Sequence, residues 1–130
     1  MKDSKQELFD QLIAPLYFYM QLSRRAYAKY LKNKILLHAL NIFSANKKIV
    51  ALLEQNPALL PEELMADAIE LLNHYGIWMN QFVEFRAAGN YQLKDEFIFH
   101  HIDDQSAYPR ESEQRFLTFY EQLKKERSNG

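Results

Sequence analysis

The residues best suited to chemistry lie in one short segment, DEFIFHHIDD, at positions 95–104. Two adjacent histidines stand among four carboxylates there, and imidazole and carboxylate groups can bind zinc or another divalent metal. The alternative is an extended arm in which Phe97 and Phe99 share one face and cover a core. We favour the arm, because apolar anchors in a long loop usually pack. The candidate metal ligands are His100, His101, Asp103 and Asp104.

Other arrangements that support catalysis are missing from the sequence. There is no cysteine, which excludes thiolate nucleophiles and zinc sites built on thiolates. No glutamate has a histidine three residues later, the spacing that a di-iron site in a helical bundle needs. No Gly-x-Ser-x-Gly motif occurs either. We therefore expect a protein that is not an enzyme and has no cofactor, with a metal-dependent enzyme using the 95–104 arm as an alternative.

The spacing of apolar residues predicts the elements that would position this segment. Apolar side chains recur at steps of three and four over four stretches, about 5–31, 34–55, 61–88 and 109–126, which predicts four helices. Pro15 lies inside the first, so we expect a kink or a restart there. Gly89 is expected to end the third helix in a left-handed conformation.

Composition and joint lengths then predict the fold class. The chain of 130 residues has only three glycines and four prolines, too few turn residues for an all-β fold. Short joints between the first three helices favour antiparallel neighbours. We expect an all-α fold, a single-domain antiparallel bundle of four main helices. A long extended arm, residues 90–108, separates helices three and four.

The charges are divided unevenly along the chain. Residues 11–53 contain basic but no acidic side chains, whereas residues 54–104 contain mostly acidic ones. A basic face could bind nucleic acid or another anionic ligand. The sequence pI of about 6.4 and the lack of a glycine-rich phosphate loop favour solvated helix faces instead. The candidate anion-binding residues, within the basic 24–48 region, are Arg24, Arg25, Lys29, Lys32 and Lys34.

The remaining features concern location and partners. Hydrophobic residues make up 48% and charged residues 25%, as in an ordinary soluble protein. The longest apolar runs are shorter than the roughly 20 residues of a membrane span, and the N-terminus lacks the core of a signal peptide. We expect a cytoplasmic protein that does not enter the membrane.

The leading functional hypothesis is a small helical interaction protein: an adaptor, a regulator or an immunity-type partner. It would act through a charge-bipolar surface rich in aromatic residues, since these make up 14% of the chain and can anchor interfaces. Its partner would be another protein or a second copy in a homodimer. Nucleic-acid or anionic-ligand binding is the first alternative, which we disfavour.

Overall fold

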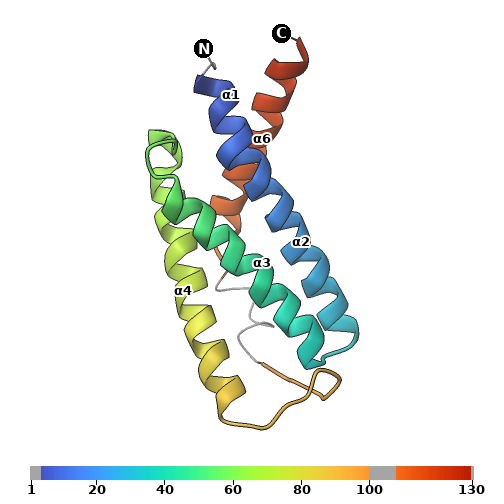
Figure 1. The fold of residues 1–130 in the computed structure, drawn as a ribbon. Helices are drawn as coiled ribbons and strands as arrows, with labels where there is room; N and C mark the ends of the chain where they lie inside the picture. Colours follow the sequence, from blue (N-terminus) through green and yellow to red (C-terminus); the bar gives the residue numbers. More distant parts are fainter. Residues whose placement is uncertain (1–3, 100–107, 130) are drawn as a thin grey trace.

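The computed structural model describes residues 4–99 and 108–129, which fold as an all-α bundle. α1, η1 and α2 follow one another without a break, so the described residues form four main helices, as predicted (Figure 1). Each predicted helix is present, with ends displaced by a few residues. The elements are α1 (Ser4–Leu8), η1 (Phe9–Ile13), α2 (Ala14–Lys32), α3 (Leu36–Gln55), η2 (Glu62–Leu64), α4 (Met65–Ala87) and α6 (Arg110–Asn129).

The first helix passes through Pro15 without stopping. A π-helical turn, η1, comes just before it, and the Ala14 N–H bonds to the Phe9 carbonyl five residues back. A proline has no N–H to donate and its ring crowds the carbonyl one turn earlier. The wider π turn is a familiar way for a helix to absorb such a defect. The predicted irregularity is therefore present, as a local change of winding within a continuous helix.

The turns between the first three helices are short. Residues 33–35 join α2 to α3, and Pro57 lies in the turn after α3. α2, α3 and α4 run alternately down and up the molecule (Figure 1). Pro61 is the cap of η2, a 3-10 turn, so α4 itself begins at Met65 and not at Pro61.

Gly89 does not have the predicted left-handed conformation. No glycine among the described residues has a positive φ. α4 ends with the Ala88 N–H bonded to the Glu84 carbonyl and the Gly89 N–H to the Arg86 carbonyl. A methyl group at Gly89 would come within 2.5 Å of the Tyr91 ring. Glycine is needed there for space beside an aromatic ring, not for an unusual backbone angle.

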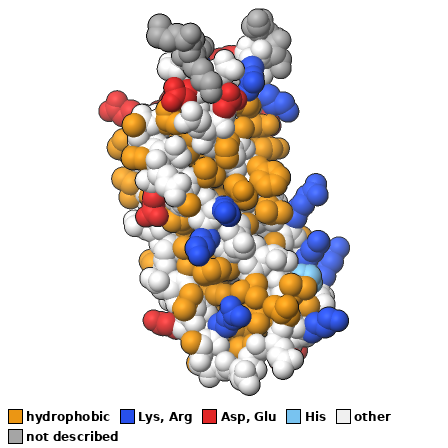
Figure 2. Space-filling model, in the orientation of Figure 1, with side chains coloured by type: hydrophobic (Ala, Val, Ile, Leu, Met, Phe, Trp, Pro, Cys, Tyr) orange, Lys and Arg blue, Asp and Glu red, His pale blue; other side chains and the backbone are white. Residues whose placement is uncertain are grey.

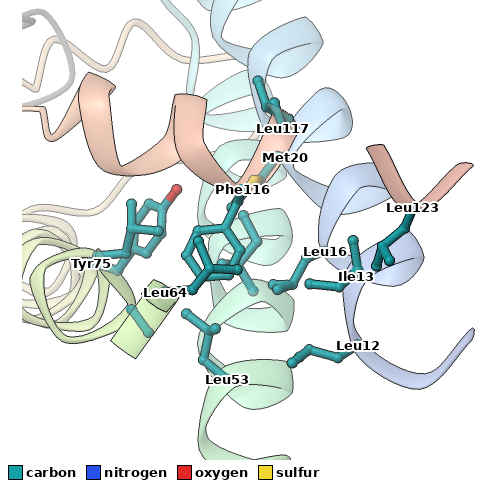
Figure 3. Packing of buried hydrophobic residues seen from close by; sticks show 13 residues of the cluster. Leu12, Ile13, Leu16, Met20, Leu53, Leu64, Tyr75, Phe116, Leu117 and Leu123 are labelled. Atoms are coloured by element: carbon teal, nitrogen blue, oxygen red, sulfur yellow. The ribbon is translucent and has the colours of Figure 1, made fainter. Parts of the chain in front are cut away.

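The buried residues form two clusters along the bundle. The cluster at the α6 end joins η1 and α2 to the end of α3, the start of α4, and α6 (Figure 3). The cluster at the arm end joins the end of α2, the start of α3 and the end of α4 to Phe97 and Phe99. Figure 1 shows why there are two: α6 covers only one end of the three-helix layer, and residues 90–99 run beneath the other.

α3 is the most apolar of the long helices. By length and composition it is a candidate membrane span, with a mean hydropathy of 1.2, which the sequence analysis did not anticipate. In this structure it packs against α2 and α4, and its buried residues belong to both clusters. Core helices of soluble proteins meet the same criterion, so this is weak evidence for a membrane.

Candidate interaction surface and buried polar network

The arm before residue 100 is attached to the start of α3 through backbone hydrogen bonds. The Leu36 N–H donates to the Asp95 carbonyl at 3.0 Å and the Leu37 N–H to the Leu93 carbonyl at 2.8 Å. The Phe97 N–H donates to the Lys34 carbonyl at 2.8 Å. The first N–H groups of a helix have no partner within it, and no side chain caps α3. The arm supplies the missing acceptors, so it is part of the fold.

Tyr30 holds the end of this arm from inside the core. Its hydroxyl donates to the Phe97 carbonyl at 2.7 Å and accepts the Phe99 N–H at 3.0 Å. Tyr30 and Phe97 are both 0% exposed. Phe97 packs edge-on against Phe85 and Tyr91. Ile98, on the opposite side of the arm, is exposed. The alternation expected of an extended arm is therefore present for residues 97–99.

The candidate metal ligands His100, His101, Asp103 and Asp104 lie outside the described residues. The metal alternative therefore stays a prediction. Within residues 4–99 and 108–129, no group of three or more histidine, aspartate or glutamate side chains is placed to hold a metal.

The candidate anion-binding residues lie on and just after the second half of α2. Arg25, Lys29 and Lys32 are exposed and follow one another at steps of four and three, so they share one side of the helix. Lys34 is half-buried. Arg24 is bound by Glu113 of α6, with its Nε donating at 3.0 Å. In Figure 2, basic side chains follow the edge of the molecule formed by α2.

A buried polar network, which the sequence analysis did not predict, joins α6 to α4 and α2. Near α4, Asp67 accepts hydrogen bonds from Ser112 at 3.0 Å and from Arg115 at 2.6 Å. Asp67 and Ser112 are buried, and the charge of Asp67 is compensated by the half-exposed guanidinium of Arg115. Asp67 lies near the start of the third predicted helix, where a carboxylate is favourable, so spacing alone does not predict its burial. Its position, one residue before Ala68 of the core, was the available signal.

The second part of the network centres on Glu113, which is also buried. It accepts hydrogen bonds from Arg24 and from the hydroxyl of Tyr108, which also shares a hydrogen bond of 2.8 Å with the hydroxyl of Tyr75. Burial is the main reason that the pKa values of both tyrosines are raised above their ordinary value. The nearby Glu113 carboxylate raises them further. Both phenols therefore remain protonated and act as hydrogen-bond donors or acceptors.

The network is suited to holding α6 in place. Each buried carboxylate has an arginine partner and a hydroxyl donor, which is the usual condition for a buried charge. An open pocket of about 450 Å³ adjoins it, lined in part by two acidic and two basic side chains, Glu70, Glu111, Arg110 and Arg115. This balance of charge does not select an anionic or a cationic ligand. We interpret the network as structural.

α4 carries a second row of apolar residues beside the row that faces the core. The core row is Leu64, Ala68, Leu71, Tyr75, Trp78 and Phe82. The second row, which we call the outer seam, follows each of these by one residue: Met65, Ile69, Leu72, Gly76, Met79 and Val83. Both rows advance by steps of four and three, the spacing of a helix that meets another helix along its length.

The outer seam is only partly covered by the bundle. Leu72 and Met79 pack against the core, whereas Met65, Ile69 and Val83 are 45%, 54% and 53% exposed. On the neighbouring helix α3, Leu40, Phe43 and Val50 are half-buried. Figure 2 shows apolar side chains over the face formed by α3 and α4, with separate charges between them.

The aromatic residues contribute little to this surface. Every aromatic residue of the chain lies in the described part, and Phe18 alone is exposed. The others belong to the two clusters or pack against them. The excess of aromatic residues noted in the sequence therefore serves the interior, and the exposed apolar residues of α4 are aliphatic or methionine.

Searches against family models, curated proteins and solved structures found no match to this chain.

Proposed function

We propose that this protein is a non-enzymatic helical interaction protein that binds its partner through the outer seam of α4. The observation that supports this is the heptad spacing of the seam, together with the exposure of Met65, Ile69 and Val83. A helix in a four-helix bundle needs one apolar stripe for its core. α4 has a second one beside it, which a further helix would cover.

The test compares two substitutions on the same helix. Ile69 lies on the seam, whereas Ile77 is 61% exposed and lies away from it. Tagged wild type, Ile69→Glu and Ile77→Glu are used to capture bound proteins from the native cell. We expect Ile69→Glu to lose the proteins that wild type retains, and Ile77→Glu to keep them. The same retained set for all three, with unchanged thermal melting, would contradict the proposal.

Anion or nucleic-acid binding through α2 is a second candidate. Arg25, Lys29 and Lys32 favour it, because they are exposed on one side of a helix. Binding would weaken steeply with added salt. A mobility shift at low salt with DNA and RNA tests it, comparing wild type with the double variant Arg25→Glu and Lys29→Glu. The variant Lys124→Glu with Lys125→Glu on α6 is the control, and no shift with wild type would end the idea.

A further inference from the structure

We infer that the partner of the outer seam is a second copy of this chain, with the two α4 helices packed antiparallel. This inference rests on the proposed function and names the partner. Its first support is the symmetry of the seam itself. A two-fold axis level with position 74 would place Met65 opposite Val83 of the second copy, Ile69 opposite Met79, and Leu72 opposite Gly76. Each large side chain would meet another apolar residue.

Gly76 allows the close approach that this packing requires. A methyl group built at Gly76 would meet no atom within 4 Å, so the backbone there is open at the surface. Glycine in the middle of a helix lowers helix stability relative to alanine, so close approach of a partner would give this residue a role. Opposite Leu72 of the second copy, Gly76 would provide room for a large side chain near the centre of the interface.

The charges at the two ends of α4 favour the antiparallel arrangement. Glu62 and Glu63 are exposed just before its start, and Arg86 is exposed near its end. Antiparallel pairing about position 74 places Glu62 opposite Arg86 of the second copy, and it does so twice by symmetry. Parallel pairing would place like charges together, which is unfavourable. Glu84 is turned about 100° further around the helix than Val83 and points away from the seam.

Sedimentation over a range of concentrations tests the association. We expect wild type and Ile77→Glu to be dimers in the micromolar range. Ile69→Glu should be a monomer with unchanged helix content, and its melting should match that of wild type in dilute solution. The dissociation constant should rise at least a hundredfold, because a charge would face Met79 of the second copy. A wild type that remains a monomer at 100-fold higher concentration, or equal dissociation by both substitutions, would overturn the inference.

The charge pairing tests the direction of the helices. Glu62→Arg should weaken the dimer by about threefold to tenfold, as expected of exposed ion pairs. Adding Arg86→Glu should restore it. A double variant weaker than either single variant would contradict antiparallel pairing.

The register can be tested with cysteine, which the chain lacks. Asn73 is exposed and lies near the proposed axis, so Asn73→Cys should form a disulfide-linked dimer on mild oxidation. Gln122→Cys, exposed on α6, should not. Cross-linking of both to the same extent would contradict the register.

These outcomes separate the dimer from the proposed function. A monomeric wild type whose captured proteins are lost in Ile69→Glu overturns self-association and leaves the interaction function standing. If Ile69→Glu dissociates the dimer but captures the same other proteins as wild type, self-association is supported. The outer seam then serves only to join two copies of this chain.

Discussion

The two ends of the bundle are closed in different ways. At the α6 end, a regular helix covers a mainly aliphatic cluster and is joined to its neighbours by side chains such as Asp67 and Glu113. At the arm end, an extended segment covers a cluster that includes Tyr30, Trp78, Phe82, Phe97 and Phe99. There the joints are hydrogen bonds to the backbone of the arm.

The difference follows from backbone hydrogen bonding. A helix satisfies most of its own N–H and C=O groups, so its side chains are free to make the connections. An extended segment that enters a core needs an outside partner for every buried N–H and C=O. Lys34, Leu36, Leu37 and Tyr30 provide those partners here. The α6 end is therefore held by contacts between side chains, whereas the arm end is held by hydrogen bonds to the backbone of the arm.

The largest expected effect is at the arm end. Phe97→Ala removes a fully buried ring in contact with several others and should lower the free energy of unfolding by about 3–5 kcal/mol. Leu123→Ala at the α6 end should lower the free energy of unfolding by less, because this side chain lies near the end of its cluster. Urea unfolding measures both. An equal or greater loss for Leu123→Ala would break the comparison.

Tyr30→Phe separates the hydroxyl from the ring. The Phe97 carbonyl and the Phe99 N–H would both lose a buried partner, at a cost of about 2–4 kcal/mol in total. Hydrogen exchange at the Phe99 amide should become faster. Tyr17→Phe, whose ring stacks on Tyr120 at the α6 end, is the control and should change little. Unchanged exchange at Phe99 would show that the hydroxyl does not hold the arm.

The α6 end should be the source of a loss of stability at high pH. The folded-state pKa of Tyr108 is raised above its ordinary value of 10.0 by burial, so the unfolded chain loses this proton first. The contribution of protonated Tyr108 to the free energy of unfolding is fully present below pH 10, and it declines as the pH rises above 10. At pH 11 the loss is about 1.4 kcal/mol for one such group.

Unfolding in urea at pH 9 and pH 11 checks this sign. Tyr108→Phe should remove about 1.4 kcal/mol of the difference in the free energy of unfolding between the two pH values. If Tyr108→Phe loses as much stability between pH 9 and pH 11 as wild type does, Tyr108 is not the cause of the loss.

The smallest expected changes in stability come from two glycines, Gly76 in α4 and Gly89 in the turn after it. Gly89→Ala should lower the free energy of unfolding by about 1 kcal/mol, because the Tyr91 ring must move from its place beside Phe85. Gly76→Ala, in open space, should raise it by about 0.5–1 kcal/mol in dilute solution. Thermal melting of both variants measures the contrast, and changes of the same sign would contradict it.

Periodicity predicted the helices well because it depends on local spacing. The recurrence of apolar residues at steps of three and four over residues 5–31 predicted the first helix, and the same pattern predicted the other three. Local irregularities within the helices were harder to predict from the sequence. The sequence marked Pro15 and Gly89 as special positions, but the π turn and the crowding by Tyr91 depend on neighbours that spacing alone does not reveal.

Partners across the fold were not predictable from spacing. Asp67 and Glu113 look like ordinary acids in the first turns of helices, and their burial depends on Arg115 and Arg24 from other elements. The hydrogen bonds from the Tyr30 hydroxyl to the arm also join residues far apart in the chain, and helical spacing does not predict them. The apolar spacing over residues 61–88 predicted the helix, but it did not predict that the outer seam stays at the surface.

The amino-acid sequence by itself determined the helices, their order and the apolar faces that must be buried, because these follow from residues three and four apart. It also determined that the arm is held by phenylalanines. The tertiary structure decided which hydroxyl and which helix end satisfy the arm, which arginines pair with buried acids, and which apolar row remains at the surface. Those contacts join residues far apart in the chain, and they depend on how the helices pack.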